Sequence, residues 1–311
     1  MDEKHEDQEL ALVAQHAGTG GPVYFSALHL PKRKWKIIDP QLTVQGKIDK
    51  LLTVGQCDDK LVCLVVMQSL QVSLVWRTDT KTWVELPQRH PILSESQFGC
   101  SAHKMWRTNA HENAFSFYTL NMQTGLWEEY LHKQDPSGKY IFATHHMYRI
   151  TCHFDGVEML DLRSKQWKPL APMYEQHFPC LLNEFLMVDL TPSVAIVIGQ
   201  SFGGHPLNAS VLFQLQHRPP WTPRWLHISF GNEGPSIDPG MWPLVIPFSH
   251  SVLLMNRKVT IEYQHNTRTW KRIQALPLLF EGGQACSARL LNQNLIREIT
   301  GIRPLEDSEI L

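Results

Sequence analysis

The chain has 311 residues, of which 43% are hydrophobic and 19% are charged, and its net charge is −1. This balance argues against a nucleic-acid-binding protein, because such proteins usually carry a basic surplus. The N-terminal residues are acidic and polar, and the apolar runs are shorter than a bilayer span, so we expect no secretory signal and no membrane partner. These features predict an intracellular protein, in the cytoplasm with the nucleus left open.

Six tryptophans recur along the chain in a similar local pattern. The gaps between them are 48, 44, 40, 58 and 45 residues, and five of the six have Thr or Ser three positions earlier. The series consists of Trp35, Trp83, Trp127, Trp167, Trp225 and Trp270. A period of about 40–50 residues with one β-unit per repeat predicts an array of blades.

Each repeat is predicted to be a meander of short antiparallel strands. Near Trp83, apolar runs at 61–67 and 72–76 precede a polar turn and a further short run. The remaining strand candidates are, in chain order, 10–15, 23–28, 114–120, 147–154, 156–162, 194–199, 209–215, 251–255, 259–263 and 285–291. We expect the Thr or Ser to close the turn and the Trp ring to pack against the neighbouring blade.

The two ends of the series complement each other. Only two strands precede Trp35, and one strand, 285–291, remains after Trp270. Pairing of 285–291 with 10–15 would complete the first blade and remove exposed sheet edges. We therefore predict an all-β, six-bladed propeller of four-stranded antiparallel blades over residues 10–292, with polar tails at 1–9 and 293–311.

Several short motifs resemble the repeats of the kelch family of β-propellers. Gly20-Gly21 and Gly203-Gly204 match the family's diglycine, Tyr118 and Tyr263 its third-strand aromatic, and Leu86-Pro87 its exit from the last strand. Residues 74–87 are also similar to the F-box-associated propellers. The resemblance implies a protein-binding function. Similar propellers often act as substrate receptors in ubiquitin ligases, which makes ligase components implied partners.

The chemical motifs in the sequence are weak. His145 and His146 are adjacent, and neighbours on a strand point to opposite faces, so we interpret them as turn or surface residues and expect no metal site. Gly199-Gln-Ser201-Phe-Gly203 has the spacing of a nucleophile elbow, but no helix is predicted after it. We expect no catalytic residues and no cofactor.

The loops are therefore predicted to carry the function, because a rigid scaffold with variable loops is a common way to bind a partner. The longest predicted loops and connections are 87–97, 106–113, 133–139, 201–206 and 230–242. Arginine and aromatic residues often anchor such surfaces. The predicted partner-binding residues are Arg89, Arg107, Phe202, His205 and Trp242.

The leading hypothesis is a non-enzymatic module that binds a peptide or protein partner. The alternatives are a propeller enzyme of the oxidase, sialidase or isomerase type, and a cytoskeletal scaffold. An enzyme would need clustered acids at the loops, for which the candidates are Glu95, Glu112, Glu233 and Asp238.

Overall fold

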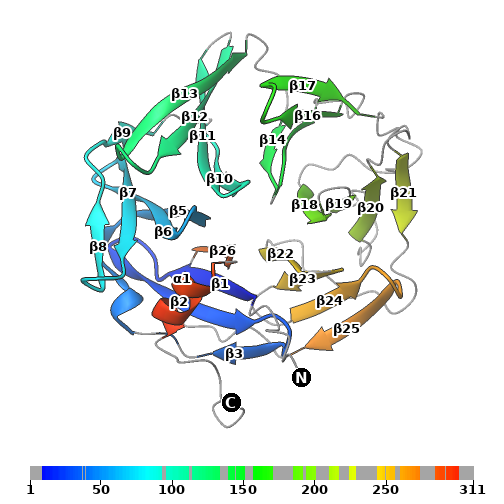
Figure 1. Ribbon diagram of the computed structural model, residues 1–311, viewed down its shortest axis with the longest axis horizontal. Coiled ribbons are helices and arrows are strands. Elements are labelled where there is room, and N and C mark those ends of the chain that lie inside the picture. The colour runs from blue at the N-terminus through cyan, green and yellow to red at the C-terminus, as the bar shows by residue number, and fades with distance from the viewer. Residues whose placement is uncertain are drawn as a thin grey trace, which may run out of the picture. The chain divides into compact units, whose positions relative to one another are not determined.

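The computed structural model describes residues 9–36, 38, 40–92, 96–111, 114–133, 139–143, 145–150, 157–170, 185–191, 194–200, 210–216, 224–228, 244–248, 250–255, 260–273, 284–290 and 292–300 (Figure 1). Apart from the short helices η1 (Pro40–Leu42) and α1 (Gln293–Thr300), every regular element in these ranges is a β-strand. The described strands form six antiparallel sheets, numbered here in the chain order of their tryptophans. The all-β class and the four-stranded antiparallel repeat are confirmed.

One compact unit consists of residues 1–110, 116–130 and 274–311. It contains the first sheet, the second sheet and all of the third sheet except residues 111–115 and 131–133. The first sheet is β26 (Gln284–Leu290), β1 (Leu10–His16), β2 (Gly21–His29) and β3 (Lys34–Lys36), with β4 (Val44–Ile48) beside β2. The second is β5 (Lys50–Cys57), β6 (Lys60–Met67), β7 (Leu70–Arg77) and β8 (Thr82–Glu85), with β9 (His90–Pro91) beside β7. The third is β10 (Phe98–Ser101), β11 (Lys104–His111), β12 (Ala114–Asn121) and β13 (Leu126–Lys133).

The other unit consists of residues 111–115 and 131–273. Its fourth sheet is β14 (Lys139–Phe142), β15 (Met147–Ile150), β16 (Val157–Asp161) and β17 (Gln166–Pro169). The fifth is β18 (Phe185–Thr191), β19 (Val194–Gln200), β20 (Ser210–Gln216) and β21 (Arg224–Ile228). The sixth is β22 (Leu244–Phe248), β23 (Ser251–Met255), β24 (Thr260–Gln264) and β25 (Thr269–Ile273).

The C-terminal strand completes the first sheet, as the sequence predicts. Strand β26 pairs antiparallel with β1, in a register that runs from Leu10 opposite Leu290 to His16 opposite Gln284. Strand β26 also lies beside β5, and β5 lies beside β10, so the first strands of these three sheets are neighbours. In the other unit β14 lies beside β18, and β18 beside β22.

All six tryptophans of the series lie in the fourth strand of their sheets, at the position the repeat predicts. Two of them contact the preceding sheet. The Trp83 ring stacks on Phe25 of β2 with 5.7 Å between the ring centroids, and its Nε1 donates to the carbonyl of Leu42 in η1 at 2.6 Å. Trp127 Nε1 donates to Ser73 Oγ of β7 at 3.2 Å. At these two positions the expected contact with the neighbouring sheet is confirmed.

The turn before five of the six tryptophans has a left-handed backbone at one position. The residue two positions before the Trp has φ between 51° and 71° in five sheets, and these residues are Arg33, Lys81, Gly125, Lys165 and Arg268. Four residues separate the paired strands in these hairpins, as between Arg77 and Thr82, and loops of this length are most often built around a type I turn. The Thr hydroxyl assists the turn at Trp127, where Thr124 Oγ1 accepts the N–H of Leu126 at 3.3 Å. The backbone angle is therefore the stricter constraint, and the sequence pattern marks it only indirectly.

The segment 293–300 is a helix, which corrects the prediction of a tail from 293 to 311. Asn292 caps α1, since its Oδ1 accepts the N–H of Leu295 at 3.1 Å. Leu295, Ile296 and Ile299 are fully buried in the core shared by the first and second sheets. Two turns of helix are too short for the periodicity to stand out in the sequence. No helix among the described residues is long and apolar enough to span a membrane.

We predict that Gly125→Ala lowers the free energy of unfolding by about 1–2 kcal/mol, the cost of a left-handed backbone for a residue with a Cβ atom. Gly125 has φ +71°, and an added Cβ would lie 3.1 Å from Pro87 Cδ. The reverse change at the equivalent position, Lys81→Gly, should leave stability unchanged or slightly raised. Urea denaturation of the two variants and the wild type measures both effects. Equal stability of Gly125→Ala and the wild type would contradict the turn assignment.

Candidate functional site: a buried arginine between two sheets

The layer between the second and third sheets is apolar at one end and polar at the other. Alternate residues of β7 face this layer, and they change from Val75 in the apolar core to Ser73 and then Gln71 toward the turn with β6. On β12, Leu120 lies in the apolar core and Ser116 lies on the same face toward the other end. At the polar end, β6 ends and β7 begins, and β11 ends and β12 begins.

Arg107 occupies the centre of this polar end. It lies on β11, two residues after the buried Met105 and on the same face, and its side chain is only 4% exposed. Its Cζ atom lies 4.7 Å from the ring centroid of Tyr118 and 5.4 Å from that of Trp127. Its Nη1 donates to Gln71 Oε1 at 3.2 Å. Two aromatic rings therefore stabilise the cation where water is excluded.

The charge of Arg107 has no carboxylate partner among the described residues. Its Nε atom is buried and makes no hydrogen bond there. Burial lowers the pKa of the guanidinium to about 10, so the group is still protonated at neutral pH. A buried charge that lacks an ion pair is unusual, because desolvation without compensation is costly.

His90 extends the polar end. The short strand β9 places His90 opposite Gln71, and cross-strand partners point to the same side of a sheet. Both His90 Nε2 and Gln71 Nε2 are buried without a hydrogen-bond partner in the described part of the chain. We call Gln71, His90, Arg107, Tyr118 and Trp127 the Arg107 cluster. It brings together three buried nitrogen atoms whose hydrogen-bonding capacity is unused.

The connection from β8 to β10 is held against the cluster by specific hydrogen bonds. Gln88 Oε1 accepts the backbone N–H of Trp127 at 2.7 Å. Further along, the N–H of Gln97 donates to Thr108 Oγ1 at 3.0 Å, and the N–H of Thr108 donates to the carbonyl of Gln97 at 2.9 Å. The described parts of this connection on both sides of His90 are therefore hydrogen-bonded to the third sheet.

We predict that His90 makes the folded state less stable as the pH falls. Burial, and then the charge of Arg107, lower the pKa of His90 from 6.5 to about 4. Between these two values the unfolded chain binds the proton and the folded chain does not, so the free energy of unfolding decreases as the pH is lowered through this window. Urea denaturation of the wild type and of His90→Asn at a series of pH values between 4 and 6.5 tests this prediction. The free energy of unfolding of His90→Asn should decrease less steeply as the pH falls. An equal dependence on pH in the two proteins would contradict the burial of His90.

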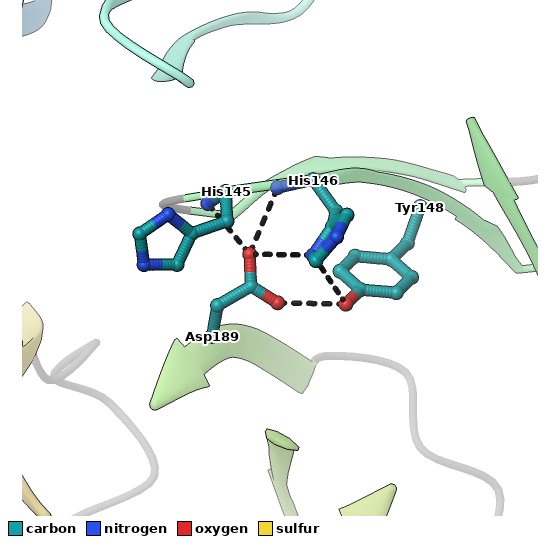
Figure 2. A network of polar contacts seen from close by, with 4 residues as sticks. All are labelled: His145, His146, Tyr148 and Asp189. Carbon is teal, nitrogen blue, oxygen red and sulfur yellow. Dashed lines mark hydrogen bonds and ion pairs between the residues drawn. The ribbon is translucent and has the colours of Figure 1, made fainter. Parts of the chain in front are cut away.

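A second polar cluster lies between the fourth and fifth sheets, around Asp189 of β18 (Figure 2). The Asp189 side chain is completely buried, and its Oδ2 accepts the backbone N–H groups of His145 and His146 at 2.6 and 2.8 Å. Its Oδ1 accepts the hydroxyl of Tyr148 at 2.7 Å, and His146 Nδ1 lies 3.3 Å from Oδ2. Burial, and then Asp189, raise the pKa of Tyr148 well above its ordinary value. This carboxylate is fully occupied by groups of the chain, so it joins two sheets rather than offering a site.

We predict that Asp189→Ala lowers the free energy of unfolding by about 3 kcal/mol or more, because three donors, two of them part-buried and one buried, lose their acceptor at about 1–3 kcal/mol each. Tyr148→Phe removes only one of these hydrogen bonds, and it should cost less, about 1.5–3 kcal/mol. Urea denaturation measures both variants. A Tyr148→Phe cost as large as that of Asp189→Ala would contradict the backbone hydrogen bonds as the main contribution.

The predicted partner-binding residues differ in how far they are buried. Arg107 is buried, whereas Arg89 is exposed and pairs with Glu85 through hydrogen bonds of 2.5 and 2.9 Å. Phe202, His205 and Trp242 lie outside the described residues, as do the candidate acids Glu95, Glu112, Glu233 and Asp238.

The predicted loops need two corrections. The loop predicted at 106–113 is wrong for residues 106–111, which belong to β11, because a β-hairpin continues there. The connection 87–97 contains β9. Of the loops at 201–206 and 230–242 and the connection 133–139, all but residues 133 and 139 lie outside the described residues.

The other chemical expectations concern histidines and metals. His145 and His146 lie in the β14–β15 turn, as predicted. Among the described residues, no group of three His, Cys, Asp or Glu side chains is arranged to hold a metal ion. Sequence reasoning missed Gln71, His90 and Asp189. A signal existed for Asp189 alone, since it is a lone charge within the apolar strand Phe185–Thr191.

Comparison with known proteins supports the fold and not a family. No protein-family model matches the chain, and no curated protein matches its sequence. Among solved structures, TolB from Acinetobacter baumannii has a TM-score of 0.58 and 9% identity over 91% of this chain, which spans 66% of the TolB chain. The fold is a β-propeller.

Two further propeller structures match nearly end to end. A chain of a nidogen/laminin complex has a TM-score of 0.55 and 11% identity, with 91% of this chain and 99% of that chain covered. A putative 6-phosphogluconolactonase from Bacteroides fragilis has a TM-score of 0.51 and 9% identity, with 93% and 100% covered. At such identities these matches establish the propeller fold alone. They do not establish the kelch or F-box-associated family, which stays a resemblance of sequence motifs.

Proposed function

We propose that this propeller is a non-enzymatic protein-interaction module that binds a peptide or protein partner at the Arg107 cluster. One observation carries the proposal: a buried guanidinium without a carboxylate partner lies beside two further buried nitrogen atoms that make no hydrogen bond within the described chain. Buried polar groups in proteins are almost always hydrogen-bonded. A partner that supplies the missing acceptors would complete the site.

The position of the cluster also supports partner binding. It lies at the end of the second–third layer where hairpin turns and a connection between sheets meet, which is where a scaffold presents variable segments. The turn residues Gln68 and Ser69 are exposed at this end, and His90 is half-buried. The cluster is therefore deep but close to solvent.

The propeller neighbours are compatible with several functions, and the fold alone does not select one. One neighbour belongs to a nidogen/laminin complex, and another is a putative 6-phosphogluconolactonase. Substrate recognition for a ubiquitin ligase is a narrower form of the proposal, and it rests on the kelch resemblance alone. An enzyme of the oxidase, sialidase or isomerase type would depend on acids that lie outside the described residues.

The proposal predicts that Arg107→Met abolishes partner capture and leaves the fold intact. Methionine fills most of the buried volume and keeps the apolar contacts with Tyr118 and Trp127, but it removes every hydrogen-bond donor. Affinity purification from cells followed by mass spectrometry would compare this variant with the wild type. Arg163→Met, which removes an exposed positive charge in a turn of the fourth sheet, is the matched control.

Partners recovered with the wild type and Arg163→Met should be absent with Arg107→Met. Thermal unfolding of all three proteins shows whether Arg107→Met is folded. Equal recovery of partners by a folded Arg107→Met protein would show that the Arg107 cluster is not the binding site.

A further inference from the structure

We infer that the Arg107 cluster binds a single carboxylate group of the partner, held by the free edge of the Arg107 guanidinium. This inference rests on the proposed function, and it specifies the chemistry that the partner must present.

One nitrogen of the guanidinium is hydrogen-bonded, and another, on the opposite edge, makes no hydrogen bond within the described chain. Hydrogen bonds form in the plane of the group, and the Nη1 atom donates to Gln71 Oε1 at 3.2 Å. The Nε atom belongs to the opposite edge, with Nη2, and it is buried without a partner in the described chain. Two parallel N–H groups on such an edge match the two oxygens of a carboxylate.

The surroundings restrict how the ligand can bind. Tyr118 and Trp127 lie with their rings 4.7 and 5.4 Å from Arg107 Cζ, so they hold the guanidinium in place. Gln71 Nε2 is an amide donor without a partner among the described residues. His90 Nε2 is a second nitrogen in the same condition, and its tautomer can supply an N–H. An oxygen of the bound ligand could therefore accept one hydrogen bond from Arg107 and another from Gln71 or His90.

The charge of the site favours a carboxylate over a phosphate. Arg107 is protonated at neutral pH and His90 is neutral, because its pKa is lowered to about 4. Among the cluster residues the net charge is therefore +1, which one carboxylate neutralises. A phosphate dianion would leave an uncompensated negative charge beside side chains that are only 1% and 4% exposed, Gln71 and Arg107.

Isothermal titration calorimetry of the full chain tests this inference with defined probes. One peptide carries a single Glu between glycines and is acetylated and amidated at its ends, and a second has Gln in place of the Glu. A third contains only glycines and has a free C-terminal carboxylate. Sodium acetate and sodium phosphate, at constant ionic strength, are the smallest probes. The Glu and free-C-terminus peptides distinguish a side-chain carboxylate from a terminal one.

We expect the wild type and Arg163→Met to bind acetate and at least one carboxylate peptide. The Gln peptide should bind at least about tenfold more weakly, because it lacks the charge-assisted hydrogen bonds. Arg107→Met should lose binding. Arg107→Lys should retain only weak binding, because an ammonium cannot make the bidentate contact.

Two results would overturn the inference: equal carboxylate binding by the wild type and a folded Arg107→Met, or absence of carboxylate binding to the wild type, whether or not phosphate binds. If cellular partners still depend on Arg107 in that case, the proposed function stands and only the carboxylate assignment fails. If carboxylates bind but no partner depends on Arg107, the site exists and the proposed function fails.

Discussion

The structure depends on the burial of both faces of its sheets. In β1, every residue from Leu10 to His16 is buried, and in β6 and β7 the buried run covers six consecutive positions. On β6 the alternate residues Leu61, Cys63 and Val65 face the first sheet, whereas Val62 and Leu64 pack with the third. A sheet of this kind is stable only where its neighbours cover it. Trp83 and Trp127, in the fourth strands of the second and third sheets, extend that cover to the edge of the sheet.

Because of this constraint, a polar residue between two sheets needs hydrogen-bond partners in the same layer. A buried polar side chain in a layer between two sheets exchanges its contacts with water for contacts within the protein. Asp189 meets the constraint within the chain, because backbone N–H groups and Tyr148 saturate its oxygens. Arg107 meets it only in part, through Gln71 and two aromatic rings. Both residues are buried, and they differ in that the hydrogen bonds of Asp189 are complete whereas those of the Arg107 cluster are incomplete within the described residues.

The sequence predicts the repeat well because the repeat is imposed at the turn. A left-handed residue two positions before the tryptophan, and a large ring that covers the sheet edge, are local requirements, and local requirements leave a periodic trace. The pairing of β26 with β1 was also predictable, because an incomplete first unit and a surplus final strand can satisfy each other. The helix α1 is harder to predict from the sequence, because its three core residues would fit any short apolar segment.

The site is predictable only in part, for a different reason. The sequence predicts Arg107 in a loop, whereas the structure places it in β11. Its surroundings come from β7, β9, β12 and β13. Gln71 and His90 come together because β9 folds back onto β7, and that pairing has no sequence motif. Contacts between sheets depend on side-chain direction in several strands at once, which a single sequence does not encode visibly. The pattern of Val75, Ser73 and Gln71 on one face of β7 becomes informative only after the register is known.

An incomplete network has thermodynamic consequences that a complete one lacks. Each buried donor without an acceptor destabilises the unliganded fold by about 1–3 kcal/mol. A ligand that supplies the acceptors recovers this free energy on binding, so it gains affinity without burying a large area. The same ligand stabilises the fold, because it binds the native state and not the unfolded chain. Partner binding at the Arg107 cluster, as proposed, would therefore be linked to the packing of the second sheet against the third, whereas Asp189, whose oxygens are already hydrogen-bonded, joins the fourth and fifth sheets.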